Sequence, residues 1–267
     1  MRWCLIVVLA AVSAAAASVP QTSAQAIQGP IPRMVRVPVV VELFTSEGCS
    51  GCAPADEFLL GLERTQPIPG VEVIALEEHV DYWNGYGRRD PFSSRVMSNR
   101  QTDYNRLFNL DDISTPQLVI GGQAQILGSD AAHAREEIVR AAKGPKANVE
   151  VSFRSASVAT VRVDKLPANA PDSDIWMAVA EGGLASSVDG GENEGRTLRH
   201  TAVVRSIVII GKVDADAPTT YSMHLKFSPK WKRDELNTWS SCRTACRKRF
   251  GARRSLPRNG HAVMVTP

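Results

Sequence analysis

An apolar run followed by two closely spaced cysteines is the feature that most constrains the fold of this chain. The run Val39–Phe44 is rich in branched residues, as expected for a strand buried on both faces. A turn then leads to Cys49-Ser50-Gly51-Cys52, and a helical pattern of apolar residues extends to Leu62. A strand, a turn and a helix in this order predict an α/β fold with both cysteines at a helix N-terminus.

The pattern of residues 37–145 continues in the same way. It alternates between apolar runs typical of strands and amphipathic segments typical of helices, and Gly121-Gly122 marks a tight hairpin near its end. This order predicts a mixed sheet with flanking helices on both faces. We expect further strands at 71–76, 117–120 and 124–127, and helices at 93–108 and 130–142.

Residues 147–238 have a different pattern of apolar and polar residues. Apolar and polar residues alternate in short runs that Pro, Asp and Gly separate, which predicts a second, smaller, mostly antiparallel β domain. The expected strands cover 149–153, 158–163, 175–180, 203–210 and 221–227.

Residues 239–267 form an atypical basic tail in which Ser, Cys, Arg and Lys crowd together. Permissible codons for this stretch, read one base out of frame, encode Val-Val-Val-Val-Gln, which is a credible strand. One hypothesis is therefore that the tail is frameshifted, which the nucleotide sequence of the gene would decide. The alternative is a basic helix with Cys242 and Cys246 one turn apart, serving as a redox or metal accessory.

Residues 1–26 have the pattern of a signal peptide. Arg2 precedes the apolar run Trp3–Ala17, and Ala24-Gln25-Ala26 offers a small-x-small cleavage site. A retained membrane anchor is the alternative, but the run is short for a bilayer span, and no later stretch is longer. We therefore expect a periplasmic or secreted protein without stable membrane insertion after cleavage.

The charge of the chain gives no reason to expect nucleic acid as a partner. The formal net charge is only +3, and much of it comes from the basic tail.

An oxidising compartment would allow closely spaced cysteine pairs to form disulfides. Such pairs close very small loops and stabilise a fold little, so thiol chemistry explains them better.

The spacing of Cys49 and Cys52 suits thiol–disulfide exchange. A sulfur at a helix N-terminus lies near unpaired backbone N–H groups, which stabilise the attacking thiolate. We expect Cys49 to face solvent and act as the nucleophile, and Cys52 to act as the resolving thiol. The alternatives are half of a structural metal site and an inert disulfide.

Several strings in the chain together resemble one family, the secreted thioredoxin-like proteins known as domain of unknown function 1223. They are Val41–Cys52, His79–Asn84, Asp90–Ser93, Thr115–Gln117 and Gly191–His200. The resemblance extends from Val39 to Leu236 and implies a thioredoxin-like fold with an added β region, but no established substrate. This chain departs from the family pattern at Ala53 and at Glu77-Glu78.

The thioredoxin-like resemblance also gives a role to Thr115 and Pro116. Proteins of that fold carry a cis-proline beside the cysteine pair, and the backbone of the preceding residue pairs with substrate. An X-Pro bond permits the cis form. An ordinary proline at the start of a strand is the alternative.

Four further residues are possible accessories of the cysteine pair. Glu42, in an otherwise apolar strand, could exchange a proton with Cys52, or it could pair with an arginine or lie at an edge. His79, Asp81 and Trp83 would share one face if their strand continues, and could line a substrate groove. A structural hydrogen-bonding role for His79 and Asp81 is favoured, and Arg196 and His200 are expected to brace the β domain.

The sequence therefore predicts an exported thiol–disulfide oxidoreductase. Its partners would be a thiol or disulfide protein substrate and an unidentified redox partner, and the prediction includes neither a cofactor nor a metal ligand. One alternative is an envelope copper-handling protein that binds cuprous ion through Cys49 and Cys52, with His79 as a third ligand. Another is a non-catalytic interaction module in which the cysteines are merely bridged.

Overall fold

The computed structural model describes residues 36–167, 173–213, 217–244 and 252–255. All of these residues belong to one unit of the chain, which begins at Val35. The predicted signal peptide (1–26) and Cys246 lie outside the described residues.

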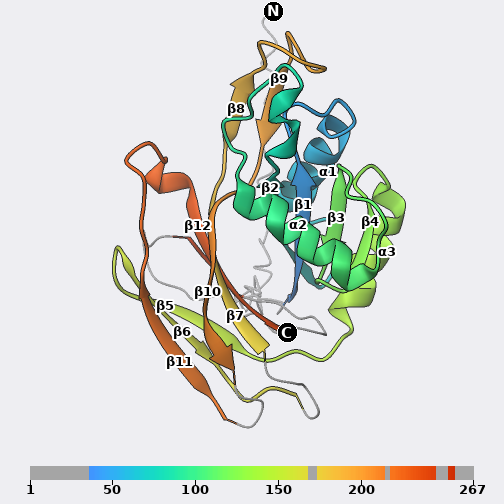
Figure 1. The fold of residues 1–267 in the computed structure, drawn as a ribbon. Helices are drawn as coiled ribbons and strands as arrows, with labels where there is room; N and C mark the ends of the chain where they lie inside the picture. The colour runs from blue at the N-terminus through green and yellow to red at the C-terminus, as the bar shows by residue number, and fades with distance from the viewer. Residues whose placement is uncertain (1–35, 168–172, 214–216, 245–251, 256–267) are drawn as a thin grey trace, which may run out of the picture. The chain divides into compact units, whose positions relative to one another are not determined.

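The N-terminal half of the described chain alternates between strands and helices, as predicted (Figure 1). The strands β1 and β2 are parallel, and β3 is antiparallel to β1, so the sheet is mixed. The elements are β1 (Val37–Thr45), α1 (Ala53–Thr65), β2 (Val71–His79), the 3-10 helix η1 (Tyr82–Gly85), α2 (Arg95–Phe108), β3 (Gln117–Ile120), β4 (Ala124–Leu127) and α3 (Ala131–Ala142).

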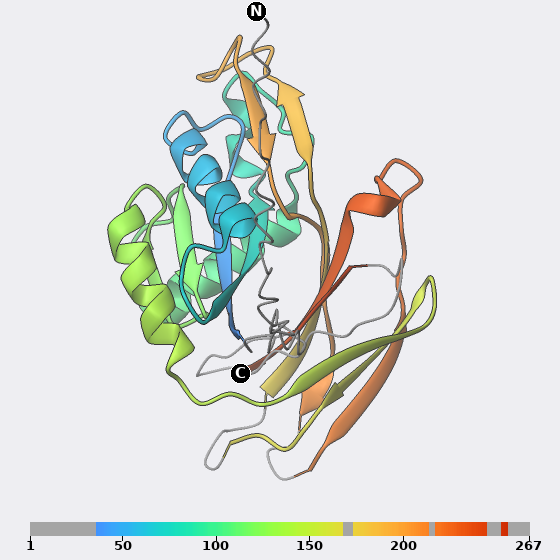
Figure 2. The ribbon, with the colours of Figure 1, turned by 180° about the vertical axis from the view of Figure 1, so that it is seen from behind.

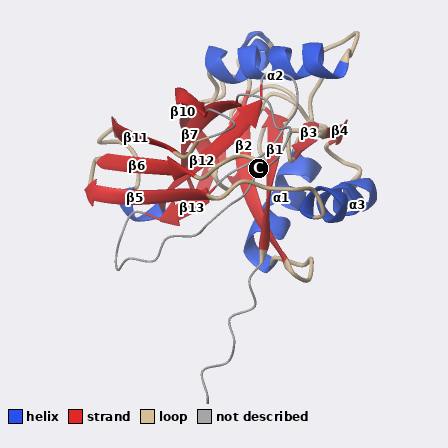
Figure 3. Cartoon of the chain, turned by 90° about the horizontal axis from the view of Figure 1, so that it is seen from below, coloured by secondary structure: helices blue, strands red, loops and turns tan. Residues whose placement is uncertain are grey.

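Alternate residues of β1 face opposite sides of the sheet, and helices cover both sides. Leu43 packs in the main apolar core with residues of α1 and α3, whereas Phe44 packs against Tyr104 of α2. Figure 3 shows α2 on one side of the sheet and α1 and α3 on the other. This alternation decides which side chains of β1 and β2 can approach α1 and the cysteines.

The second half consists of strands and one short 3-10 helix. The elements are β5 (Val149–Ser155), β6 (Val158–Val163), β7 (Ser173–Glu181), β8 (Leu184–Ser187), β9 (Thr197–His200), β10 (Val203–Val213), β11 (Thr219–His224), η2 (Arg233–Glu235), β12 (Leu236–Thr244) and β13 (Ala252–Ser255). In the described residues these strands and the first four form an eight-stranded sheet of order β13-β12-β7-β10-β2-β1-β3-β4, a three-stranded sheet β11-β6-β5 and the hairpin β8-β9.

The main sheet contains strands from both predicted domains, because β10 pairs with β2 at Val203 and Glu77. Strands β7, β10 and β12, which come from the predicted second domain, extend the first sheet. The physical reason is that β1 occupies only one edge of β2, and the other edge would otherwise leave its backbone groups unpaired. Whether 37–145 and 147–238 fold independently stays a prediction.

The last long strand enters the basic tail. β12 continues to Thr244 and pairs with β7 over its whole length, so residues 239–244 are a strand and not the basic helix considered as an alternative. The frameshift hypothesis stays a prediction. Within the described ranges, we find no helix with the length and apolar character needed to cross a membrane.

Candidate functional site

The cysteines lie in the turn between β1 and α1, as the sequence predicts. Cys52 is the N-cap residue of α1, and its carbonyl oxygen accepts hydrogen bonds from the N–H groups of Ala55 (2.8 Å) and Asp56 (3.0 Å). Cys49 and Cys52 form a disulfide with their Cα atoms 5.4 Å apart. The sequence pattern predicts a helix from Cys49, but α1 begins at Ala53. Residues 49–52 instead form a turn, closed by a hydrogen bond from the Cys52 N–H to the Cys49 carbonyl.

The expectation that Cys49 faces solvent is wrong for this disulfide state. Cys49 is 3% exposed and Cys52 is fully buried, whereas Ser50 and Gly51 between them are exposed. Residues 46–52, which we call the cysteine loop, therefore reach the surface at Ser50 and Gly51, whereas both cysteines are buried.

The connection between β8 and β9, residues 188–196, packs against the cysteine loop. Asn193 Nδ2 donates hydrogen bonds to the carbonyl oxygens of Glu47 (2.9 Å) and Cys49 (3.0 Å). Glu192 Oε2 accepts a hydrogen bond from the Ser50 N–H (2.9 Å). Figure 2 shows the β8-β9 hairpin beside α1, where Ala53 contacts Val188 and Leu198. A segment whose Glu192 is 142 residues from Ser50 in sequence thus covers the candidate site.

Thr115 and Pro116 lie beside the disulfide, and the bond between them is cis. The Thr115 carbonyl oxygen is 3.8 Å from Cys49 Sγ, and Trp83 Nε1 donates a hydrogen bond to Thr115 Oγ1 (2.8 Å). Gly128 permits this packing, because a Cβ atom there would lie 2.6 Å from Pro116 Cβ and 3.0 Å from Ala55 Cβ. The structure therefore brings Trp83, Thr115 and Pro116 to the cysteines.

Asp81 and His79 do not join Trp83 on one strand face, so that expectation is wrong. The strand β2 ends at His79, and Asp81 is the N-cap residue of η1. Asp81 accepts a hydrogen bond from Ser98 Oγ and pairs with Arg95 Nε (3.0 Å), both in α2. Asp81 thus anchors the start of α2, which is the structural role that the sequence favoured.

Glu42 pairs with an arginine on the face of the sheet that α2 covers. Arg100 Nε lies 3.0 Å from Glu42 Oε1 and 3.3 Å from Glu78 Oε1, and the Tyr104 hydroxyl donates a hydrogen bond to Glu42 Oε2. Burial, together with the neighbouring Glu42 charge and despite the Arg100 guanidinium, raises the pKa of Glu78 to about 8. We call Glu42, Glu78, Arg100 and Tyr104 the arginine cluster. Because α1 lies on the other face, Glu42 has the arginine-pairing role and not the role of proton donor to Cys52.

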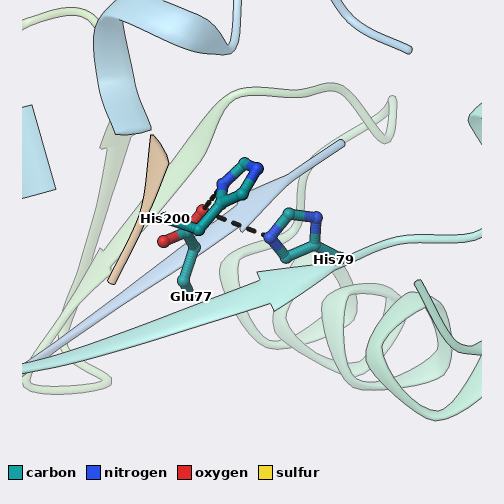
Figure 4. Close-up of side chains that lie close together, drawn as sticks. All are labelled: Glu77, His79 and His200. Atoms are coloured by element: carbon teal, nitrogen blue, oxygen red, sulfur yellow. Dashed lines mark hydrogen bonds and ion pairs between the residues drawn. The ribbon is translucent and has the colours of Figure 1, made fainter. Parts of the chain in front are cut away.

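The opposite face carries a second buried group, which we call the histidine cluster: Glu47, Glu77, His79, Asp90 and His200 (three of them in Figure 4). Asp90 Oδ2 is 2.7 Å from His79 Nδ1, and His79 Nε2 is 3.2 Å from Glu77 Oε1. The same Glu77 oxygen is 2.6 Å from His200 Nδ1. His200 Nε2 lies 3.4 Å from Glu47 Oε1, an ion-pair distance without hydrogen-bond geometry.

The histidine cluster extends to the protein surface and to the cysteine loop. Arg88 donates two hydrogen bonds to Glu47 Oε2 and pairs with Asp189, whose side chain is 82% exposed. The Glu47 N–H donates to Asp90 Oδ2 (2.9 Å), which fixes the backbone two residues before Cys49. The cluster therefore connects β2, the hairpin and the cysteine loop.

Charges within this cluster shift the pKa values of its members. Burial would lower the pKa of His200, but the Glu77 charge, the hydrogen bond to Glu77 and the nearby Glu47 carboxylate raise it to about 9. His79 behaves in the same way: despite burial, the Asp90 carboxylate raises its pKa well above the usual value. Burial disfavours the Asp90 carboxylate, yet the His79 charge holds its pKa at about 2. The two imidazoles thus carry protons that the surrounding carboxylates stabilise.

Asp56 of α1 lies on the same face as this cluster. Its Oδ1 accepts a hydrogen bond from Thr45 Oγ1 (2.6 Å), and its Oδ2 is buried without a hydrogen-bond partner among the described residues. Burial and the charge of Glu77 raise the pKa of Asp56 to about 7.

The family model described as "Protein of unknown function (DUF1223)" matches residues 40–239. The chain belongs to the DUF1223 family. Among solved structures, this DUF1223 chain is similar to a protein from Agrobacterium tumefaciens determined by a structural genomics consortium, with a TM-score of 0.62 and 24% identity. The similarity covers 77% of this chain and 86% of the other, and at this identity it shows the fold alone. A comparison with curated proteins found no match.

Sequence reasoning missed the roles of Glu47, Asp90, Asn193 and Glu192, and assigned His200 only to the β domain. A signal was present, because all five residues fall inside the strings that resemble DUF1223 proteins. What the strings do not show is that Gly191–His200 lies against the cysteine loop and β2.

Proposed function

We propose that this DUF1223 protein is an exported thiol–disulfide oxidoreductase with a thioredoxin-like fold. The observation that carries the proposal is the Cys49–Cys52 disulfide at the N-terminus of α1, with the Thr115 carbonyl 3.8 Å from Cys49 Sγ. The thioredoxin-like description is supported by the element order β1-α1-β2-α2-β3-β4-α3 and by the cis-proline immediately before β3.

The proposed reaction is an exchange of two thiols for one disulfide. In the reduced protein, the Cys49 thiolate attacks a sulfur of the substrate disulfide, forms a mixed disulfide and expels one substrate thiolate. The Cys52 thiolate then attacks Cys49 Sγ, which expels the second substrate thiolate and forms the Cys49–Cys52 disulfide. Protons from solvent neutralise the substrate thiolates, and the reverse sequence oxidises a dithiol substrate.

The helix N-terminus and the cis-proline loop have separate roles in this proposal. The free N–H groups at the start of α1 favour the negative charge of the Cys49 thiolate. In this proposal the backbone of Thr115, whose carbonyl oxygen lies 3.8 Å from Cys49 Sγ, would pair with a substrate strand, and the hydrogen bond from Trp83 holds that residue in place.

Access to Cys49 requires a local opening, since the residue is only 3% exposed. Asn193 links the covering segment 188–196 to the cysteine loop through two hydrogen bonds. In the proposed cycle this segment moves away from the loop, so that a substrate sulfur can approach Cys49 Sγ in line with the bond that breaks.

The low exposure of Cys49 also favours a second candidate function, a non-catalytic interaction module with a structural disulfide. In that case the covering segment would protect the bridge permanently. The two candidates differ in whether the reduced thiol is reactive in the native protein.

The test is disulfide reduction activity together with alkylation of the reduced protein across pH. We expect catalysis of insulin reduction that Cys49→Ser abolishes and the control Cys242→Ser leaves unchanged. The alkylation rate of Cys49 should reach half of its plateau well below pH 8.5, about the value for free cysteine. No activity, combined with an alkylation profile of ordinary cysteine, would support the structural disulfide instead.

A further inference from the structure

Glu77, His79 and His200 form a group of potential metal ligands that is separate from the cysteines. Their ligand atoms lie within 4.8 Å of one another, and all three residues are buried (Figure 4). Glu77 and His79 come from β2, whereas His200 is the last residue of β9. One Glu77 oxygen lies 3.2 Å from His79 Nε2 and 2.6 Å from His200 Nδ1.

Each imidazole presents one nitrogen to Glu77 and has a carboxylate at its other nitrogen. Asp90 Oδ2 is 2.7 Å from His79 Nδ1, and Glu47 Oε1 is 3.4 Å from His200 Nε2. Metal-binding histidines are typically held in this way, because an outer carboxylate fixes the ring orientation and increases the basicity of the nitrogen that faces the ion.

A further carboxylate oxygen is available on the α1 side. Asp56 Oδ2 is buried and has no hydrogen-bond partner among the described residues. The other oxygen of this carboxyl, Oδ1, accepts a hydrogen bond from Thr45 Oγ1 (2.6 Å), and Thr45 is the β1 residue that pairs with His79 of β2. A buried and unpaired carboxylate oxygen is costly unless a cation or a donor approaches it.

The surroundings of the group favour a cation and exclude water. Metal binding requires neutral imidazoles and releases their protons. In that state the carboxylates of Glu77, Glu47 and Asp90 outnumber Arg88, the one permanently charged cation that we find paired with them in the described residues. The Phe92 ring packs edge-on against both imidazoles, with ring centroids 5.3 Å apart in each case. With its imidazoles neutral, this buried site therefore has excess negative charge and an apolar wall.

We propose that Glu77, His79 and His200 bind a divalent transition-metal ion, with Zn²⁺ as the best match, in a closed structural site that Asp56 can complete. Imidazole and carboxylate ligands suit Zn²⁺, and closed four-coordinate sites are typical of its structural role. The ion would join the β8-β9 hairpin to β2 and so hold Glu192 and Asn193 against the cysteine loop. The site does not use Cys49 or Cys52, so the metal proposal does not rest on the proposed redox activity.

The test is titration of the metal-stripped protein with Zn²⁺ in a calorimeter, with the disulfide intact. We expect one Zn²⁺ per chain and at least tenfold weaker binding in Glu77→Gln and His200→Gln. The control His133→Gln, at a half-exposed histidine of α3, should bind as the wild type does. The double variant Cys49→Ser/Cys52→Ser should also retain the ion.

X-ray absorption of the Zn²⁺-loaded wild type tests the same site without depending on a variant that folds. We expect nitrogen and oxygen ligands at about 2.0–2.2 Å and no sulfur at about 2.3 Å. The proposal is overturned if the wild type binds no Zn²⁺, if sulfur ligands are found, or if Glu77→Gln and His200→Gln bind Zn²⁺ as tightly as the wild type. A protein that binds Zn²⁺ but does not reduce insulin would contradict only the redox proposal. A protein that reduces insulin but does not bind Zn²⁺ would contradict only the metal proposal.

Discussion

The arginine cluster and the histidine cluster lie on opposite faces of the sheet at β2, and they differ in how they balance their charges. The arginine cluster depends on one permanent cation, Arg100, which is 4% exposed and contacts the Trp176 ring at 4.6 Å. The histidine cluster uses two imidazoles and continues through Arg88 to the exposed Asp189. The two clusters therefore differ in role. The arginine cluster is a closed structural group, whereas the histidine cluster connects β2 to the cysteine loop and to the protein surface.

The largest expected effect is the loss of the single cation in the arginine cluster. Arg100→Met leaves Glu42 and Glu78 buried without a cation, and removal of one partner from such a group costs about 3–5 kcal/mol of unfolding free energy. Urea denaturation measures this change. The matched control is Arg106→Met on the same helix, where the side chain is 75% exposed and the cost should stay below about 0.5 kcal/mol. Equal costs for the two variants would show that the arginine cluster contributes no special stability.

Disruption of the histidine cluster should cost less. His200→Gln, studied with a chelator present, leaves Glu77 with His79 and the Thr201 N–H as partners, so we expect a loss of about 1–3 kcal/mol. Because the cluster also fixes the backbone before Cys49, alkylation of reduced Cys49 should change at least threefold in this variant and remain unchanged in Arg100→Met. The comparison fails if both variants alter the reactivity of Cys49 equally.

A smaller change in stability is expected when the covering segment is released. Asn193→Ala removes two hydrogen bonds, and the loss should be about 1–1.5 kcal/mol, mostly as local opening. Because 1.4 kcal/mol of opening free energy corresponds to about a tenfold population change, alkylation of reduced Cys49 should accelerate about tenfold. Iodoacetamide kinetics under native conditions measure it. An unchanged rate would mean that the segment does not limit access to the sulfur.

The smallest effect is expected at Glu192, which is exposed and accepts the Ser50 N–H. The backbone hydrogen bond lowers the pKa of Glu192, so it is a carboxylate at neutral pH. Glu192→Gln removes a negative charge near the Cys49 thiolate, and alkylation should accelerate less than threefold at low salt. The acceleration should vanish at high salt, and an effect that persists there would indicate a change in structure rather than in charge.

Much of the fold was predictable because local patterns determine it. The strand–turn–helix around Cys49 and the hairpin at Gly121-Gly122 follow from short segments of sequence, and the cis bond before Pro116 was implied by the thioredoxin-like resemblance. The pairing of β10 with β2 was not predictable in this way. Strand pairing across more than 120 residues depends on which edge remains unpaired after the first strands assemble, and no local pattern records it.

Only the residues of the candidate site that lie in short, recognisable stretches of sequence were predictable. Cys49, Cys52, Thr115 and Pro116 were identified because they form recognisable strings, whereas Trp83 was identified from a strand that was expected to continue past His79 and does not. The alternatives for Glu42 included the arginine pairing that the structure has, and the sequence could not choose between them because the face of Glu42 depends on where α2 packs. The covering role of Asn193 was missed because it needs the hairpin, and neither β8 nor β9 has a strong alternating pattern.

The reduction potential of the Cys49–Cys52 disulfide, measured by equilibration with glutathione buffers, tests the redox proposal most directly. The redox proposal predicts a reduction potential in the range of exchange-active cysteine pairs, roughly −270 to −120 mV. A value below roughly −300 mV, as in structural disulfides of secreted proteins, would contradict it.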